Sequence, residues 1–216
     1  APNKVYMELQ QLTRERDQIV AERSAIKNQL HAETIQAKPN TNSVRRLKER
    51  IAFLNRQEKE IKGEIDVIID NNEDVKKEIK NIISIPGIGK LTAVIVLAET
   101  NGFELIRNKK QLTSYAGLDV KEKQSGTSVR GKPRISKKGN RSLRKAMYLP
   151  SLSAVKYDEN FKGQYVRIVS KHGIKKKGLI AVQRKMLELI YTLFKNKTVY
   201  DKNYESKKSS AKILVA

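Results

Sequence analysis

The side chains best suited to phosphate chemistry lie close together in the middle of the sequence. Between Lys121 and Lys145 there are ten basic residues and one acid, Glu122. A serine hydroxyl in such surroundings can attack a phosphodiester, provided that it loses its proton and that fixed cations match the charge developing on the phosphoryl oxygens. Ser125, Ser128 and Ser136 are the candidates. From the residues alone, a catalytic serine and a serine that only contacts phosphate remain alternatives, with Ser136 closer to a phosphate contact or a helix-entry residue.

The segment from Leu118 to Asn140 exceeds twenty residues and shows little periodicity, which predicts a long basic loop that is functional or disordered. Its hydroxyls and amides can donate short hydrogen bonds to phosphate, and its arginines offer bidentate forks. A flexible loop that binds a nucleic-acid backbone without specificity is the alternative. The residues expected to contact nucleic acid here are Gly126, Ser128, Arg130, Lys132, Arg134, Ser136, Lys137, Lys138, Asn140, Arg141 and Arg144.

A second candidate phosphate-binding element is the run Ile85-Pro86-Gly87-Ile88-Gly89-Lys90. The proline and the two glycines end one helix, and the small-residue run from Leu91 to Glu99 begins another. A helix, a glycine-rich turn and a second helix are typical of a helix-hairpin-helix element, whose turn amides hold a phosphate without reading sequence. Gly87, Gly89 and Lys90 are therefore expected nucleic-acid contacts. A plain turn between helices explains the same residues equally well.

Charge divides the chain into two parts. Of its 216 residues 45 are Lys or Arg and 23 are Asp or Glu, a formal charge of +22. Residues 1–80 carry 16 basic and 14 acidic side chains, whereas residues 81–216 carry 29 and 9. The first part therefore reads as a helical scaffold with little affinity for nucleic acid, and the second as a polyanion binder. A membrane surface is a weaker candidate, because no Trp-rich or Phe-rich amphipathic stripe accompanies the charge.

Other classes of site find little support in the sequence. The absence of Cys excludes disulfide scaffolds and thiolate chemistry, and is compatible with a reducing, cytoplasmic location. No cluster has metal-ligand spacing, so no cofactor is expected in this chain. His31 is expected to be solvated on a helix, and His172, before Gly173, to cap a helix end or contact phosphate.

No apolar run approaches the length of a membrane span. The chain starts at Ala1 without an initiator Met, and we expect it to be part of a longer protein.

Heptad repeats predict two long helices, over residues 4–36 and 43–83. The first has Val5, Leu12, Ile19 and Ile26 in one column and Leu9, Arg16, Arg23 and Leu30 in the other. The second has an unbroken apolar column from Leu47 to Ile82, and a partner column that contains two polar residues, Glu58 and Asn72. A period of 3.5 favours an antiparallel hairpin, a dimeric coiled coil or both over an ordinary bundle. We expect self-association through residues 43–83.

Shorter helices are predicted beyond the Gly-rich turn. They cover residues 109–116, 141–157 with a bend at Pro150, 160–171 and 176–197, the last with an apolar stripe that belongs to a core. The fold is therefore expected to be all-α: a long coiled-coil helical hairpin over 1–83, a small helical domain over 84–201, and a disordered basic tail over 202–216.

Several motifs, taken in order, resemble the C-terminal domain of the IS one-ten insertion-sequence transposases. The resemblance covers about residues 82–201 and departs from the family at Val120 and Pro150. Its motifs are Ile85 to Gly89, Phe103, Leu112 to Leu118, Gln124-Ser125-Gly126, Arg134 to Asn140, Leu143-Arg144, Phe161, Tyr165, Gly173, Arg184-Lys185 and Tyr200.

The resemblance implies a DNA recombinase guided by a structured bridge RNA. In that family an N-terminal RuvC-like domain with four acidic, Mg-binding residues cooperates with a serine of the C-terminal domain, which singles out Ser125 here. No RuvC-like pattern is visible in this chain, so Mg is expected to belong to a missing domain. The expected partners are DNA, the guide RNA and further copies of the chain. The competing hypothesis is a noncatalytic helix-hairpin-helix nucleic-acid-binding protein that dimerises through its coiled coil.

Overall fold

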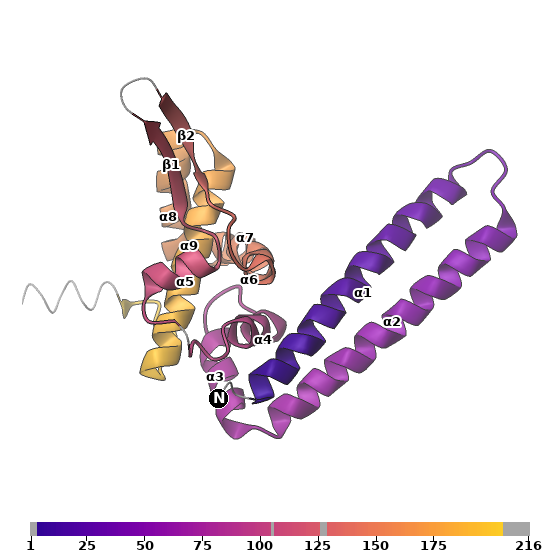
Figure 1. The fold of residues 1–216 in the computed structure, drawn as a ribbon, viewed down its shortest axis with the longest axis horizontal. Coiled ribbons are helices and arrows are strands. Elements are labelled where there is room, and N and C mark those ends of the chain that lie inside the picture. The colour runs from indigo at the N-terminus through magenta and orange to yellow at the C-terminus, as the bar shows by residue number, and fades with distance from the viewer. Residues whose placement is uncertain (1–3, 105, 126–128, 205–216) are drawn as a thin grey trace, which may run out of the picture. The chain divides into compact units, whose positions relative to one another are not determined.

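The computed structural model describes residues 4–104, 106–125 and 129–204, with the side chains of 122–133 excepted (Figure 1). Two compact units, residues 1–73 and 74–216, make up the chain. As expected, the fold is all-α, apart from one two-stranded antiparallel sheet. The elements are α1 (Lys4–Thr34), α2 (Thr41–Asp70), α3 (Glu73–Ile83), α4 (Lys90–Glu99), α5 (Lys109–Tyr115), β1 (Val120–Ser125), β2 (Val129–Ile135), α6 (Arg141–Ala146), α7 (Tyr148–Tyr157), α8 (Glu159–His172) and α9 (Lys175–Asn196).

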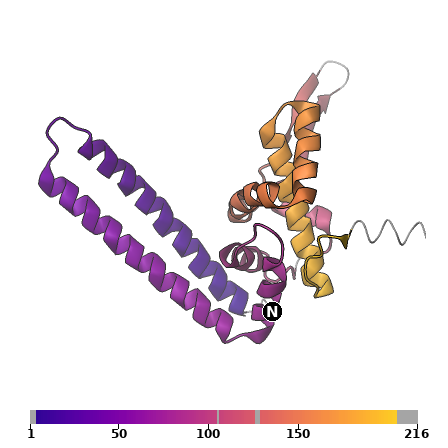
Figure 2. The same ribbon diagram turned by 180° about the vertical axis from the view of Figure 1, so that it is seen from behind.

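The first unit is an antiparallel pair of helices, α1 and α2 (Figure 2). Pro39 lies in the connection, where its missing N–H and fixed φ prevent a continuous helix. The N-cap of α2 is Asn40, because its side chain accepts a hydrogen bond from the Ser43 amide at 3.0 Å. The apolar residues that the heptads predict are inside at Ile19, Ile26, Leu54 and Ile61.

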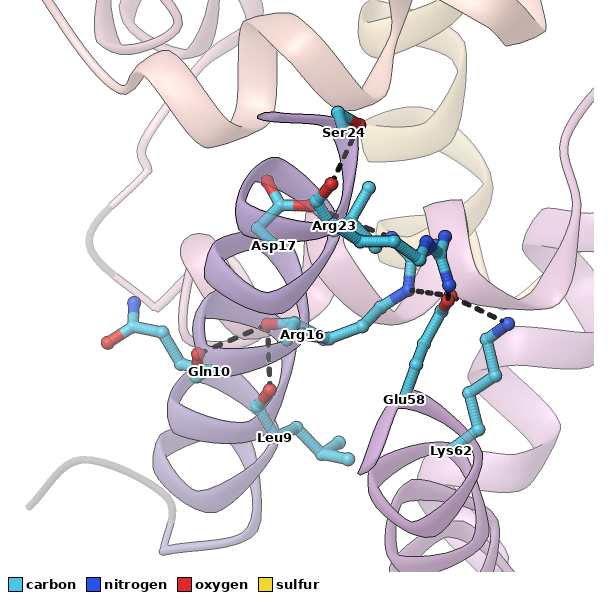
Figure 3. Close-up of polar contacts among 10 residues, drawn as sticks. Leu9, Gln10, Arg16, Asp17, Arg23, Ser24, Glu58 and Lys62 are labelled. Carbon is cyan, nitrogen blue, oxygen red and sulfur yellow. Dashed lines mark hydrogen bonds and ion pairs between the residues drawn. The ribbon is translucent and has the colours of Figure 1, made fainter. Parts of the chain in front are cut away.

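The polar residues of the two heptad seams meet one another (Figure 3). Arg16 donates to Oε1 of Glu58 through Nε at 3.2 Å and Nη2 at 2.9 Å, Arg23 donates to Oε2, and Lys62 Nζ lies 2.9 Å from Oε1. Burial by itself raises the pKa of Glu58, but the hydrogen bonds from Lys62, Arg23 and Arg16 outweigh it and lower the pKa to about 2. One carboxylate thus compensates both arginines of the α1 seam within a single chain.

The predicted continuous helix over 43–83 is wrong, since α2 ends at Asp70 and α3 begins at Glu73. Asn71 caps α2, and the Asn72 side-chain amide donates to the Ile68 carbonyl at 2.7 Å. Asparagine side chains compete with the backbone for hydrogen bonds, and acidic residues such as Glu73 favour the start of a helix. The heptad pattern of the sequence nevertheless continues into α3, where Val75, Ile79 and Ile82 are buried at helical spacing. Whether the paired helices form a coiled coil between chains stays a prediction.

The core of the second unit forms around α4 and α9. Every residue of α4 from Ala93 to Glu99 is buried. Phe103 is fully buried and packs edge-on against Tyr191 of α9, with ring centroids 5.4 Å apart, and against Phe194 at 5.0 Å. Of the predicted stripe of α9, Leu179, Val182, Met186 and Leu193 are buried and Leu189 is half-buried. No helix in the described part of the chain is both long enough and apolar enough to span a bilayer.

Two predictions for the middle of the chain need correction. The expected long loop is a β-ribbon, in which β1 pairs with β2 from Val120↔Ile135 to Ser125↔Val129. Both strands are mainly polar, so they lack the apolar alternation that reveals a half-buried strand. The expected single helix over 141–157 is divided into α6 and α7 at Met147. Pro150 lies in the first turn of α7, where a missing N–H costs nothing.

The glycine-rich turn before α4 packs against α7. Gly87 has φ +89°, and a Cβ added there would lie 2.6 Å from the Pro150 carbonyl oxygen and 2.9 Å from the Ala154 nitrogen. Gly89, the N-cap of α4, has ordinary extended backbone angles and open space around it. Packing therefore accounts for Gly87, while its role in binding phosphate stays a prediction.

The Glu58 cluster predicts a pH-dependent contribution to the stability of the first unit. Glu58→Gln should destabilise the α1–α2 pair by about 1–3 kcal/mol at pH 7, because Arg16 and Arg23 lose their counter-charge. The pKa of Glu58 is lower in the folded protein than its unfolded value near 4.5, so the ionised carboxylate stabilises the folded state above pH 4.5. This stabilisation disappears as the pH falls towards 2. Amide hydrogen exchange in α1 and α2 measures the effect locally. Glu49→Gln, which removes the exposed pair with Arg45, is the matched control and should change little.

The packing of Gly87 predicts a large difference between two Gly→Ala substitutions. Gly87→Ala should cost more than about 2 kcal/mol, because both the positive φ and the contact with the α7 backbone oppose a Cβ. Gly163→Ala, at an interior position of α8 with open space around it, should be neutral or stabilise by up to about 1 kcal/mol. Denaturant unfolding followed by circular dichroism compares the two. Equal effects would contradict the packing of the turn on α7.

Candidate nucleic-acid interface

The foot of the β-ribbon brings together two motifs that are about twenty residues apart in the sequence. Beyond the Val120↔Ile135 pair, the Ser136 amide donates to the Asp119 carbonyl at 2.8 Å and the Lys137 amide to the Gly117 carbonyl at 3.1 Å. The Asn140 amide donates to the Tyr115 carbonyl at 2.7 Å. The end of α5 and the entry to α6 are thereby tied to one another, and the ribbon extends from this junction (Figure 1).

Two glycines make this junction possible. Gly117 has φ +66°, and a Cβ there would meet the Arg144 guanidinium at 2.7 Å and the backbone of residues 137 and 138 at 3.1 Å. Gly139 has φ +146°, and a Cβ there would meet the Tyr115 carbonyl oxygen and, at 2.8 Å, the Gly117 nitrogen. Any side chain at Gly139 would therefore separate the two segments.

Asn140 connects the junction to the core through Glu99. Its Oδ1 accepts from the Leu143 amide at 2.8 Å, which caps α6, and its Nδ2 donates to Glu99 Oε2 at 2.6 Å. The Tyr115 hydroxyl donates to the Glu99 carbonyl at 2.8 Å. Glu99, which is 2% exposed, was not predicted from the sequence to belong to a site. The available signal was a carboxylate at the end of an otherwise apolar run, a position that requires buried hydrogen-bond partners.

Several residues that were expected to contact phosphate form hydrogen bonds within the protein instead. The Ser136 hydroxyl donates to the Asp119 carboxylate at 2.5 Å and accepts from the Lys138 amide at 3.3 Å. Arg144 Nη1 donates to the Ala116 carbonyl at 2.7 Å. Together with Asn140, these side chains hold the junction. Their direct contact with nucleic acid stays a prediction.

Four other expected contacts form the exposed basic surface of this junction: Arg134, Lys137, Lys138 and Arg141. Arg134 lies at the foot of β2 opposite Lys121, Lys137 and Lys138 lie in the connection to α6, and Arg141 is the first residue of α6. Among the described residues, no carboxylate forms an ion pair with any of the four. The sequence also contains no acid from residue 133 to residue 157. We refer to these four residues as the junction cations.

The candidate nucleophile lies at the far end of the ribbon. Ser125 is the last residue of β1 and pairs with Val129, and Arg130 and Lys132 belong to β2. The side chains of these residues lie outside the described part of the chain, as do Gly126 and Ser128 in full. The roles of all five therefore remain predictions.

The Gly-rich turn lies away from the junction cations. Gly89 and the exposed Lys90 begin α4, whereas Glu99, which holds Asn140, ends it. Ten helical residues separate the two ends by about 15 Å. The two expected phosphate-binding elements thus lie near opposite ends of one buried helix.

The histidines and acids do not assemble into a further site within the described residues. His31 and His172 are exposed in the last turns of α1 and α8, and Gly173 follows His172 in the left-handed conformation. In the ranges that the structure describes, no three His, Asp or Glu side chains gather closely enough to hold a metal ion. A four-acid Mg site of the RuvC-like kind does not fit these residues.

Comparisons with known proteins bear on the second unit. Residues 79–166 match the sequence model of the Transposase IS116/IS110/IS902 family. The chain is 32% identical over 123 residues to the pilin gene-inverting protein of Moraxella bovis, covering 56% of this chain and 38% of that protein. It is 28% identical over 120 residues to the insertion element IS110 uncharacterized 43.6 kDa protein of Streptomyces coelicolor, covering 56% and 29%.

The matched region contains the whole junction, from α5 through the ribbon to α6 and α7. An insertion element IS900 uncharacterized 42 kDa protein of Mycobacterium paratuberculosis is 24% identical over 139 residues, 64% of this chain and 35% of that protein. The chain thus spans well under half of the length of these curated relatives. Over residues 79–166, the chain is thus similar to the Transposase IS116/IS110/IS902 family.

Proposed function

We propose that this chain is the coiled-coil and C-terminal part of a transposase that binds DNA and a structured guide RNA and that cuts and rejoins DNA strands through a phosphoserine. The family match and the pilin gene-inverting relative support the rearrangement of DNA. The observation that carries the proposal is the set of junction cations. They are exposed, form no ion pair with a carboxylate among the described residues, and lie at the foot of the ribbon that carries Ser125.

In the proposed reaction, the Ser125 hydroxyl oxygen attacks the phosphorus of a DNA phosphodiester. The new bond joins Oγ to phosphorus, the bond to the 3′ oxygen breaks, and the serine proton ends on that oxygen as a 3′ hydroxyl. Attack by the 3′ hydroxyl of another strand reverses these bond changes, rejoins DNA and restores the serine. One phosphodiester is exchanged for another, so no external energy source is required.

The junction cations position DNA in this proposal. They hold the phosphate backbone at the foot of the ribbon, about 13 Å or more from Ser125, because four residues of an extended strand separate Ser125 from Lys121, the partner of Arg134. The hydrogen bonds of Asn140, Arg144 and Ser136 fix the base of the ribbon, so the cations stand on a rigid support. The cations therefore act on the binding and alignment of the strand and not on the charge of the transition state.

Two further components are proposed to come from outside this chain. A RuvC-like domain supplies the Mg-binding carboxylates, and the bridge RNA supplies the choice of DNA sequence. The relatives' greater length leaves room for such a domain. The α1–α2 pair is proposed to join further copies of the chain, using seam residues that a single pair leaves half-buried, such as Val44, Leu47 and Ile51.

A noncatalytic nucleic-acid-binding protein remains the second candidate function. The exposed cations and the helix-hairpin-helix-like turn serve such a protein equally well. The difference lies in Gln124-Ser125-Gly126, which a binding protein does not need.

Binding should depend strongly on salt through the junction cations. For duplex DNA, each phosphate that a protein neutralises contributes about 0.9 to the slope of log affinity against log salt. Lys137→Gln with Lys138→Gln should therefore lower the slope by up to about 1.8. The control pair, Lys27→Gln with Lys48→Gln on α1 and α2, changes the net charge equally and should leave the slope unchanged. Equal slopes in both variants would show that only total charge matters.

Formation of the covalent protein–DNA adduct should depend on Ser125 and on no other serine. In the full-length protein with guide RNA and Mg²⁺, Ser125→Ala should abolish the protein–DNA adduct and strand exchange, with binding changed less than about twofold, because one neutral hydroxyl adds little beside so many cations. Adducts are trapped on a denaturing gel, and the attached residue is mapped by mass spectrometry. Ser128→Ala is the matched control and should keep the adduct. A surviving adduct in Ser125→Ala would identify another nucleophile.

A further inference from the structure

One outer face of α6 and α7 combines apolar and basic side chains without any acid. The two helices follow one another closely, since the Met147 amide donates to the Leu143 carbonyl and the Ser151 amide to the Met147 carbonyl across the break. The two short helices therefore follow one another with only Met147 between them. We call the exposed face the α6–α7 stripe. Its members are Arg141, Lys145, Tyr148, Leu149, Leu152 and Lys156.

The opposite face of the same helices is fully inside the protein. At 100° per residue, the stripe residues of α7 fall within one sector about 100° wide with the buried residues on the other side, and in α6 Arg141 and Lys145 lie opposite Leu143. Those buried residues are Leu143, Met147, Pro150, Ser151 and Ala154. The stripe is thus an outward surface, and its apolar side chains do not belong to the core.

The apolar centre of the stripe is unusually open. Tyr148 is 48% exposed, Leu149 70% and Leu152 45%. Single exposed apolar residues are common, but three side by side on two turns of one helix face mark a surface that another molecule covers. Cations stand at both ends of this centre, with Arg141 and Lys145 before it and Lys156 after it.

Charge decides which molecule fits. A second copy of this unit is a poor occupant, because residues 81–216 carry 29 basic and 9 acidic side chains and would repel themselves. A membrane surface is also poor, since three apolar side chains without Trp or Phe bury little area. A polyanion with flat apolar faces satisfies both parts of the stripe. Unpaired nucleotides have this chemistry, with phosphates for the cations and bases that stack on an aromatic ring.

We propose that the α6–α7 stripe binds an unpaired strand of DNA, with a base stacked on Tyr148, its neighbours against Leu149 and Leu152, and phosphates at Arg141, Lys145 and Lys156. From Arg141 to Lys156 the stripe spans at most about 22 Å, the length of up to about six stacked nucleotides at ~3.4 Å each. DNA is the expected strand because the proposal rests on the proposed function, and strand exchange passes through unpaired DNA beside the cut.

The test compares an unpaired with a paired ligand on the whole chain. Fluorescence anisotropy measures binding of a ten-nucleotide dT oligomer, the matching rU oligomer and a ten-base-pair DNA duplex at fixed salt. Tyr148→Ala should weaken binding of the dT oligomer about 5- to 100-fold, the range for loss of one stacked base, and change duplex binding less than about twofold. Tyr148→Phe should restore the affinity. Tyr204→Ala, which removes an exposed tyrosine outside the stripe, should have no effect.

Each other outcome has a definite meaning. If neither DNA ligand binds, the proposed function itself fails. If both bind and Tyr148→Ala has no effect, or weakens both equally, only the stripe proposal is overturned. An effect confined to the rU oligomer overturns the choice of DNA. If sedimentation shows a dimer that Leu149→Ser dissociates, or if anionic vesicles bind through Tyr148, the occupant is a second copy or a lipid surface. Far-UV circular dichroism confirms that each variant folds.

Discussion

The antiparallel contact between residues 115–119 and 136–140 is the constraint on which the second unit depends. It requires two glycines, because Gly117 and Gly139 have backbone angles that side chains rarely adopt and face backbone atoms at contact distance. The contact brings Asn140 to Glu99, and through it α6 to α4. The ribbon, the junction cations and the α6–α7 stripe all take their positions from this one arrangement.

Charged residues serve different purposes in the two units. In the first, Arg16 and Arg23 lie in an otherwise apolar seam and share one carboxylate, Glu58. Such a cluster adds little net stability over an apolar seam, but it opposes any register that separates the charges. In the second unit, the junction cations have no such carboxylate among the described residues. Exposed cations without partners are available to an external polyanion, whereas compensated ones are not.

Basic and polar side chains at the junction also divide into two groups. Arg144, Ser136 and Asn140 give their hydrogen bonds to Ala116, Asp119 and Glu99, and so build the support. The junction cations stand on that support and remain exposed. Under the proposed function, loss of Arg144 would therefore disturb the fold and binding together, while loss of Lys137 would affect binding alone.

The sequence by itself determined the helical class, the paired helices, the core stripe of α9 and the basic character of the second unit, because periodicity and charge are local properties. It did not predict the ribbon between Val120 and Ile135, whose polar strands are specified by cross-strand hydrogen bonds and not by apolar alternation. Nor did it predict that Arg144 and Arg141 have different roles. Both are arginines one helical turn apart, and only the packing of α6 against the end of α5 turns one inward to a carbonyl and leaves the other exposed.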